Sequence, residues 1–334
     1  MILLADLHLG LGQDNSLWHN TSIDLAAEIH DIGIKHNEDT IAVLGDIFDN
    51  RKFVNQKTYN VARKIIIDIW QDFKVILVRG NHDTYYKDEP CPHWLEMFSE
   101  CDHVVVVDQE PYIESNCCFV PWGYDVADIP KDMYLFCHAE INNFKMNNFY
   151  ECRVSNLSSV DFSRFKAVYS GHFHFPQTSG NITYLGSPFH QNFGDVGSQR
   201  GYYILHPGQS PIQFFEFTKA AKFVILMANE KFTPEKIKGN VVKLVFDRDY
   251  GTKKNNELVE RMELLEPASW TIDTTRFSID HSTVEEQTED ITIKDTETLL
   301  WDYIDSVPLP EHLNKKTMKK MTELLIKEIN LDAD

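Results

Sequence analysis

Residues 40–49 read Thr-Ile-Ala-Val-Leu-Gly-Asp-Ile-Phe-Asp, an apolar run followed at once by glycine and two carboxylates. A short run of this kind, rich in β-branched residues, is typical of a buried strand. Four similar units occur in the first two hundred residues: Ile2–Ala5 before Asp6 and His8, Lys74–Arg79 before Asn81 and His82, Met133–Cys137 before His138, and Ala167–Ser170 before His172 and His174. The repetition predicts buried strands that each deliver polar residues at their carboxyl end.

Helical spacing separates several of these strands. Leu25, Ile29 and Ile32 fall on one face of a helix, and Val61 and Ile65 fall on one face of another. Alternating strands and helices predict the α/β class, a β-sandwich flanked by helices. Because sites in such sheets form beyond the carboxyl ends of the strands, we expect the five strand ends to share one site.

The pattern changes after residue 217. Strands are predicted at Phe223–Met227, Val241–Phe246 and Thr271–Ile279, with one helix opening at Thr233-Pro234 and another over Asn256–Leu265. We therefore predict an α/β domain at 1–217, a small α+β domain at 218–281, an acidic linker at 282–298 and a helical hairpin at 299–334. The apolar faces of that hairpin are expected to bind a partner protein through Leu300, Tyr303, Ile304, Val307, Met318, Met321, Leu325 and Ile329.

Composition narrows the class of protein. The 334 residues carry a formal net charge of −19, so an exposed surface would repel nucleic acid wherever basic residues are not concentrated. Six cysteines without a C-x-x-C pair indicate reduced thiols rather than a zinc ribbon or a disulfide framework. Ionisable residues from Asp6 onward argue against a signal peptide. No apolar run reaches the about 20 residues of a membrane span, so we expect a soluble, cytoplasmic protein without a membrane partner.

The strand ends carry the donors of a metal centre. They are two carboxylates, four imidazoles and one amide: Asp6, Asp46, His8, His138, His172, His174 and Asn81. Oxygen and nitrogen donors without thiolate suit manganese, iron or zinc better than calcium. Seven donors exceed the need of one tetrahedral ion but fit two ions that share a carboxylate, which is the usual clamp for displacement at phosphorus.

A further histidine, His82, stands beside Asn81. In a tight loop its side chain would point away from that donor, where it can stabilise the transition state or protonate the leaving oxygen. Either Asp49 or Asp83 can orient the His82 ring. The sequence leaves that choice open.

In chain order the motifs are D-x-H, G-D-x-x-D, G-N-H-D, a strand-end histidine and G-H-x-H. This set resembles the signature of calcineurin-like metallophosphoesterases. Within that superfamily the chain is similar to SbcD-type recombination nucleases, the catalytic subunits of double-strand-break repair complexes. The likeness is carried by Asp6-Leu-His8-Leu-Gly10, Gly45-Asp-Ile-Phe-Asp49 and the segment from Tyr184-Leu-Gly-Ser-Pro188 to Gln199-Arg-Gly201. The compact length and Pro121-Trp122 look most like the T-even-type bacteriophage versions, which implies the host cytoplasm as location.

The resemblance implies roles for these residues. Asp6, His8, Asp46 and His174 would hold one metal ion; Asp46, Asn81, His138 and His172 would hold the other, with Asp46 bridging. His82 would be the catalytic histidine that holds no metal. The chain departs from the family pattern in its short first strand and in Asp49, where many relatives carry histidine.

The resemblance also implies an activity and partners. The expected activity is a manganese-dependent DNA nuclease that degrades duplex ends as an exonuclease and cuts single strands as an endonuclease. It would act as a homodimer, with the residue 218–281 domain as a cap and the terminal hairpin docked on the coiled coil of an SbcC-type ATPase. Two alternatives are another metallophosphoesterase, acting on phosphoproteins or small phosphodiesters, and a scaffold without activity. Asp83 stands where protein phosphatases usually have glutamate, and the seven retained donors disfavour a scaffold.

Other residues have two interpretations. Basic residues near the motifs either contact DNA phosphates or are ordinary surface charges: Arg51, Lys52, Lys87, Lys145 and Arg200. An apolar set forms either a dimer contact or core: Val61, Ile65, Ile69, Trp94 and Phe98. His19, His30 and His36 are expected to be solvated, and His190 either approaches the site or does not. Because acidic residues outnumber basic ones, we expect DNA to be held by a few local basic loops, the metals and mainly the partner, with weak, salt-sensitive affinity for the isolated chain.

Overall fold

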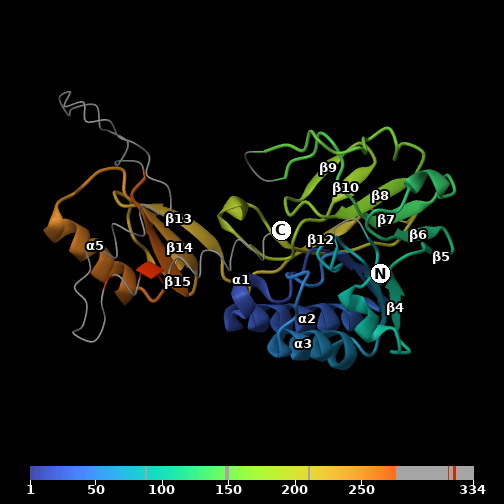
Figure 1. The fold of residues 1–334 in the computed structure, drawn as a ribbon, viewed down its shortest axis with the longest axis horizontal. Helices are drawn as coiled ribbons and strands as arrows, with labels where there is room; N and C mark the ends of the chain where they lie inside the picture. The colour runs from blue at the N-terminus through green and yellow to red at the C-terminus, as the bar shows by residue number, and fades with distance from the viewer. Residues whose placement is uncertain (87–88, 147–149, 210, 276–314, 316–318, 321–334) are drawn as a thin grey trace. The chain divides into compact units, whose positions relative to one another are not determined.

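The computed structural model describes residues 1–86, 89–146, 150–209, 211–275, 315 and 319–320. Two six-stranded sheets dominate it (Figure 1). The first has the order β12 (Gln213–Glu216), β11 (Gly201–Ile204), β1 (Ile2–Leu4), β2 (Thr40–Leu44), β3 (Lys74–Val78), β4 (Val104–Val107). The second has the order β5 (Tyr112–Glu114), β6 (Cys117–Val120), β7 (Tyr134–His138), β8 (Ala167–Gly171), β10 (Ile182–Tyr184), β9 (Gln177–Ser179).

The two sheets pack face to face. Strands alternate their side chains, so Leu3 and Leu44 of the first sheet share one apolar core with Phe119 and Phe136 of the second. The last two rings stack with centroids 4.7 Å apart. In each sheet the central strands run parallel, β1 to β4 in the first and β6, β7, β8 and β10 in the second. Their carboxyl ends therefore reach a common edge of each sheet.

Helices cover the outer face of the first sheet (Figure 1). After the short α1 (Leu11–Asp14), the long α2 (Ser16–His36) starts at Asn15, whose side chain accepts the Leu17 N–H, and ends at Asn37 in the left-handed conformation. Next, α3 (Gln56–Arg63) continues into the π-helix η1 (Lys64–Ile69). The Trp70 indole donates to the Ala26 carbonyl at 3.1 Å and so joins the two helical segments. The described residues also form the 3-10 helices η2 (Trp94–Phe98), η3 (Val126–Asp128) and η4 (Phe193–Asp195).

A separate three-stranded parallel sheet follows along the chain. Its order is β13 (Phe223–Met227), β14 (Val241–Val245), β15 (Ser269–Asp273), and its helices are α4 (Pro234–Ile237) and α5 (Thr252–Leu264). Leu226, Leu244 and Met262 belong to its own apolar core. It adjoins the main sheets through β13, where Phe223 stacks on Trp18 with ring centroids 5.6 Å apart.

The predicted α/β sandwich with covering helices is confirmed. In the small domain three elements differ in their limits: β14 ends at Val245, β15 begins at Ser269 and ends at Asp273, and α5 spans Thr252–Leu264. The early start of α5 follows a turn in which the Asp249 carboxylate accepts the Gly251 N–H. The domain limits stay a prediction, as do the acidic linker and the hairpin with its partner-binding residues. Those segments lie outside the described residues, except for three lysines of the hairpin. Within the described ranges, no helix is both long and apolar enough to cross a bilayer.

Candidate metal centre

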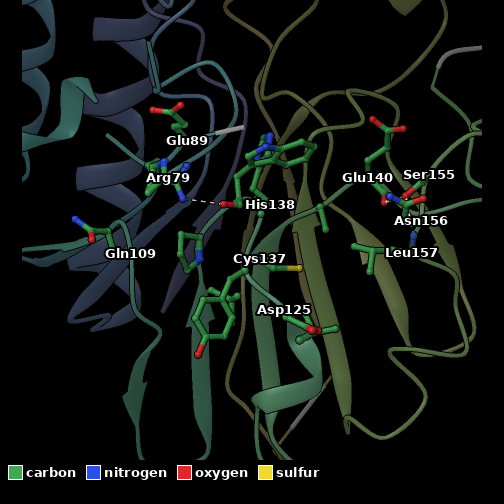
Figure 2. Close-up of a pocket in the computed structure, with 18 of the residues that line it drawn as sticks. Arg79, Glu89, Gln109, Asp125, Cys137, His138, Glu140, Ser155, Asn156 and Leu157 are labelled. Atoms are coloured by element: carbon green, nitrogen blue, oxygen red, sulfur yellow. Dashed lines mark hydrogen bonds between the residues drawn. The ribbon is translucent and has the colours of Figure 1, made fainter. Parts of the chain in front are cut away.

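The structure brings the seven predicted donors together. Asp6 and His8 follow β1, Asp46 follows β2, and Asn81 follows β3 in the first sheet. His138 ends β7, while His172 and His174 follow β8 in the second. Figure 2 shows His138 at the end of its strand, with Arg79 on one side and Glu140 on the other.

Unusual backbone geometry makes this convergence possible. Asp6, His8 and Asp46 adopt left-handed conformations, with φ of 55°, 45° and 51°. Gly45 has φ of 85°, and a Cβ atom there would lie 2.1 Å from Nδ1 of His138. Only glycine therefore lets the two sheets approach this closely. The approach also lets Nδ1 of His138 donate to the Leu44 carbonyl at 2.9 Å, which turns Nε2 toward the donors.

The first group of donors is Asp6, His8 and His174, whose ligand atoms lie within 4.8 Å of one another. Nε2 of His8 lies 3.2 Å from Nε2 of His174. Nε2 of His174 lies 4.0 Å from the Asp6 carboxylate. Two imidazole nitrogens this close need a proton or a cation between them, because two lone pairs repel. A shared metal ion satisfies both.

The second group is Asp46, His138 and His172, again within 4.8 Å. Oδ1 of Asn81 lies 3.0 Å from Nε2 of His138 and 3.0 Å from Nδ1 of His172. Oδ2 of Asp46 lies 3.4 Å from Nε2 of His138 and 3.7 Å from Nε2 of His8. One carboxylate oxygen thus reaches a histidine of each group, which is the placement that a bridging ligand needs.

Burial and mutual charge set the protonation of the donors. Burial, reinforced by Asp46, raises the pKa of Asp6 to about 6. Burial opposes the charge on Asp46, but His138 and its other neighbours hold the Asp46 pKa well below its usual value. Although burial opposes the His138 charge too, Asp46 raises the pKa of His138 to about 9.

Of the other three histidines, His8 also has a raised pKa, because its contacts with Asp49 and Asp46 outweigh burial, whereas His172 and His174 behave oppositely. Burial and the charge of His138 lower the pKa of His172 to about 3, and burial and His8 lower the pKa of His174 well below its usual value. Both rings are therefore neutral at physiological pH and ready to ligate. Imidazoles, carboxylates and one amide together fit divalent metal ions, and His172 and His174 are already neutral whereas His138 has to release a proton to ligate.

His82 lies beside this centre without joining either group. Its Nδ1 is 2.8 Å from the Asp49 carbonyl, and its ring centroid lies 4.9 Å from that of His8. Burial lowers the His82 pKa despite the nearby Asp46. The group His8, Asp49 and His82 also has ligand atoms within 4.8 Å, so proximity alone does not separate a ligand from a proton donor here.

The two candidate orienting carboxylates have different surroundings. Oδ1 of Asp49 lies 3.2 Å from Nδ1 of His8, so its carboxylate orients His8 while its carbonyl faces His82. Asp83 is fully buried and accepts the Gly80 and Phe48 N–H groups at 2.8 and 3.0 Å. It ties two motif loops together, and within the described residues its carboxylate makes no hydrogen bond to the His82 ring. Among the described contacts, orientation of His82 falls to Asp49 through its main chain.

Several contacts were not predicted from the sequence. Oε2 of Glu140 lies 3.4 Å from Nε2 of His172, and the Trp122 ring lies 5.0 Å from the His172 ring. Gln191 donates to the Asp6 carbonyl at 2.6 Å. Trp122, His138 and Glu140 also line a cleft of about 820 Å³ (Figure 2). Glu140 could have been predicted from the sequence, because it follows the strand-end His138 by two residues. Trp122 and Gln191 approach the donors only through the tertiary fold.

Arg200 is not placed as a DNA contact. It is 3% exposed, and its guanidinium pairs with Asp195 at 2.7 Å and donates to Ser187 and to the His174 carbonyl. All of these partners lie within the protein, so the side chain supports His174 and is not available to a phosphate. Of the other basic candidates, Arg51 is half-buried, Lys52 and Lys145 are exposed, and Lys87 lies outside the described residues.

The apolar set that was predicted to form either a dimer contact or core is divided between the two environments. Ile65 and Phe98 are buried core residues, while Val61, Ile69 and Trp94 are partly buried and pack against the same core. Of this set, only Val61, Ile69 and Trp94 keep exposed surface for a dimer contact.

The remaining histidine predictions concern His19, His30, His36 and His190, which differ in burial. His19, expected to be solvated, is buried, with Nε2 2.8 Å from the Thr58 hydroxyl, because its helix packs against α3. His30 is half-buried and His36 is exposed. His190 is buried, and its nitrogens contact the Ser198 carbonyl and the Phe223 N–H. Both of its ring nitrogens are engaged away from the seven donors, so His190 is not a metal ligand in this arrangement.

Comparison with known proteins defines the class. Residues 1–188 match the family described as calcineurin-like phosphoesterase, and the chain belongs to that family. This match covers all seven donors and His82, which makes the chain a metal-dependent phosphoesterase.

One relative is similar over nearly the whole length. It is "Exonuclease subunit 1" of Enterobacteria phage T4, 27% identical over 341 aligned residues that cover 91% of this chain and 92% of the relative. The resemblance to the SbcD-like nucleases of T-even phages is thereby confirmed.

Proposed function

We propose that this chain is the nuclease subunit of a DNA recombination and repair complex and hydrolyses phosphodiester bonds with two divalent ions, manganese being the best fit. The observation that carries the proposal is the position of Asp46, whose single Oδ2 atom faces His8 in one group and His138 in the other. The similarity to a phage protein named as an exonuclease subunit supports DNA as the substrate.

When bound, the ions would supply positive charge for the phosphoryl oxygens and lower the pKa of a water nucleophile. The chain's own residues prepare this chemistry. Asp6, His8 and His174 hold one position, Asn81, His138 and His172 hold the other, and Asp46 fixes their spacing. Glu140 orients the His172 ring, as a carboxylate beside a ligating histidine commonly does.

His82 would move the proton. Its Nδ1 faces the Asp49 carbonyl, which leaves Nε2 to exchange a proton with the leaving oxygen. Burial lowers the His82 pKa, so the neutral ring keeps its proton on Nδ1 and a lone pair on Nε2; Nε2 would first take a proton from solvent and then pass it to the leaving oxygen. The cleft beside His138 offers room for the nucleotide on one side of the scissile bond.

DNA would be held chiefly by the assembly. The net charge of −19 favours weak and salt-sensitive binding by the isolated subunit, and of the described basic candidates near the motifs only Lys52 and Lys145 are exposed. Duplex ends would be degraded exonucleolytically and single strands cut endonucleolytically. The chain would form a homodimer and dock its C-terminal hairpin on an SbcC-type ATPase; the relative's description as a subunit supports an assembly of several chains.

The test of the activity is digestion of end-labelled duplex DNA with manganese, with and without the partner ATPase and ATP. We expect manganese-dependent release of nucleotides, lost in Asp46→Ala and His82→Ala. Wild-type rates in either variant, each carrying metal, would refute the mechanism. Hydrolysis of p-nitrophenyl phosphate without any cleavage of oligonucleotides would instead favour a phosphoesterase of small substrates or phosphoproteins.

Partner binding is tested separately. A chain ending at Asp295 should keep its basal nuclease activity and lose association with the ATPase. Association that survives this truncation would show that the hairpin is not the docking element.

A further inference from the structure

A second group of metal-type donors lies outside the centre described above. One ring nitrogen of His93, Sγ of Cys91 and a carboxylate oxygen of Glu96 lie within 4.8 Å of one another. The three residues belong to one short segment: Cys91 and His93 precede η2, and Glu96 lies in its first turn. The His93 side chain is 1% exposed, Cys91 is half-buried and Glu96 is exposed, so the group reaches from the interior to the surface. Oε1 of Glu96 lies 3.8 Å from Nε2 of His93, and its exposed side chain would turn toward Nδ1 to share a metal ion with that nitrogen.

The hydrogen bonds of His93 leave one nitrogen free. Oδ2 of Asp108 lies 3.0 Å from Nε2, so the neutral ring carries its proton there and donates it to this carboxylate. Nδ1 then holds a lone pair, and within the described part of the chain this buried atom has no hydrogen-bond partner. A buried nitrogen left without a partner costs free energy that a bound cation would recover. A carboxylate on the far nitrogen is also the usual support of a ligating histidine.

The donor types indicate the metal. Thiolate, imidazole and carboxylate together are typical zinc ligands, and three protein donors leave the fourth tetrahedral position to solvent. The strand-end centre offers only oxygen and nitrogen donors. Divalent ions of different softness would therefore partition between the two groups of ligands.

The position of the group suggests what a metal would do there. Thr84 and His93 form an antiparallel bridge, and the Trp94 N–H donates to the Asp83 carbonyl at 2.9 Å. The segment is thus bound to the loop that carries Asn81 and His82. Asp108 follows β4, and its neighbour Gln109 donates to Sγ of Cys91 at 3.3 Å. Gln109 also lines the cleft beside the catalytic centre (Figure 2).

We propose that Cys91, His93 and Glu96 bind a zinc ion, supported by Asp108, and that this ion fixes the segment behind the catalytic loop to the end of β4. On binding, the Cys91 thiol releases its proton to solvent and a zinc–sulfur bond forms. No oxidation or reduction is involved. The site is structural and separate from the ions that act on the phosphodiester.

The experiment uses cobalt(II) as a spectroscopic probe of the full-length chain. Cobalt bound to thiolate gives a sulfur-to-metal charge-transfer band in the near ultraviolet, which the strand-end donors cannot produce. We expect this band in the wild type, at about one sulfur-bound cobalt per chain. It should persist in Cys101→Ser, the matched control at a half-buried cysteine outside the group, and disappear in Cys91→Ser.

A second measurement needs no variant. Zinc should slow alkylation of Cys91 by about tenfold or more and leave Cys101 unchanged, as read by mass spectrometry of the labelled peptides. A wild type without the charge-transfer band, or equal zinc protection of both cysteines, would overturn the proposal. Neither result would bear on nuclease activity, which is measured with manganese on DNA.

Discussion

The two groups of metal-type donors are built in different ways. The strand-end centre draws Asp6, Asp46, Asn81, His138 and His174 from five separate segments, and the two sheets hold those segments in place. The loop group takes Cys91, His93 and Glu96 from one segment and relies on Asp108 for support. Donors fixed by buried strands are preorganised before a metal arrives, whereas donors on a loop gain order from the metal itself. A preorganised centre suits catalysis, whereas a loop whose order depends on a bound metal suits a structural role.

The largest effect is expected at the carboxylate that joins the two halves of the strand-end centre. In the wild type, the main-chain N–H of His82 donates to Oδ1 of Asp46 at 2.8 Å. Asp46→Asn keeps an oxygen for this hydrogen bond but removes the negative charge that would bridge the two ions. Loss of several kcal/mol of transition-state stabilisation corresponds to about 10³-fold in rate. The measurement is the manganese-dependent rate on DNA.

The control for that variant is Asp24→Asn on the exposed side of α2, which should retain wild-type rates. A fall of less than about tenfold in Asp46→Asn, with the thermal unfolding profile unchanged, would contradict the bridging role.

The next largest effect is expected at the buried ion pair between Arg200 and Asp195, which supports His174. Arg200→Met leaves the carboxylate of Asp195 buried and unpaired, and breaking a buried pair costs about 3–5 kcal/mol. Urea unfolding should report this loss of stability. A cost below about 1 kcal/mol would mean that Arg200 is a surface charge after all, in conflict with its burial.

A smaller effect is expected at the glycine that allows the sheets to approach. Gly45→Ala places a methyl group 2.1 Å from Nδ1 of His138, whereas Gly123→Ala, at a similar φ of 82°, meets nothing within 4 Å. Both variants strain the backbone, so their difference measures the clash alone. We expect Gly45→Ala to cost about 2 kcal/mol more in urea unfolding. Equal costs would show that the two sheets can move apart freely.

The smallest expected effect is the change in metal affinity for each unit of pH. In the metal-free centre the pKa of His138 is raised to about 9, so at neutral pH this ring holds a proton that a metal must displace. Apparent affinity should therefore rise about tenfold per pH unit between pH 7 and pH 9 and level off above. Isothermal titration with manganese at several pH values checks this. Affinity independent of pH in that range would show that His138 is not a ligand.

The sequence was sufficient for the donors but not for their surroundings. Asp46 and His138 could be recognised because each ends an apolar run, and strand ends of parallel sheets must meet. Arg200 could not be placed, because a single basic residue gives no sign of burial beside Asp195. The loop group has no C-x-x-C pair, and one cysteine followed by histidine and glutamate gives no sign in the sequence that the three side chains meet.

Packing also decided residues that periodicity left open. Ile65 and Phe98 carry the same apolar character as Val61, yet only the first two are fully enclosed. His19 sits on a helix like His36, but it faces α3 and so is buried. Which side of a helix meets a neighbour depends on the arrangement of both elements. That arrangement is a property of the tertiary fold.

The most direct test of the central claim is the electron paramagnetic resonance spectrum of the manganese-loaded chain. Two ions that share Asp46 should be magnetically coupled, with about two manganese ions bound per chain. Asp46→Asn should abolish the coupling. A spectrum of isolated manganese ions in the wild type, at full loading, would contradict a centre in which one carboxylate joins both metals.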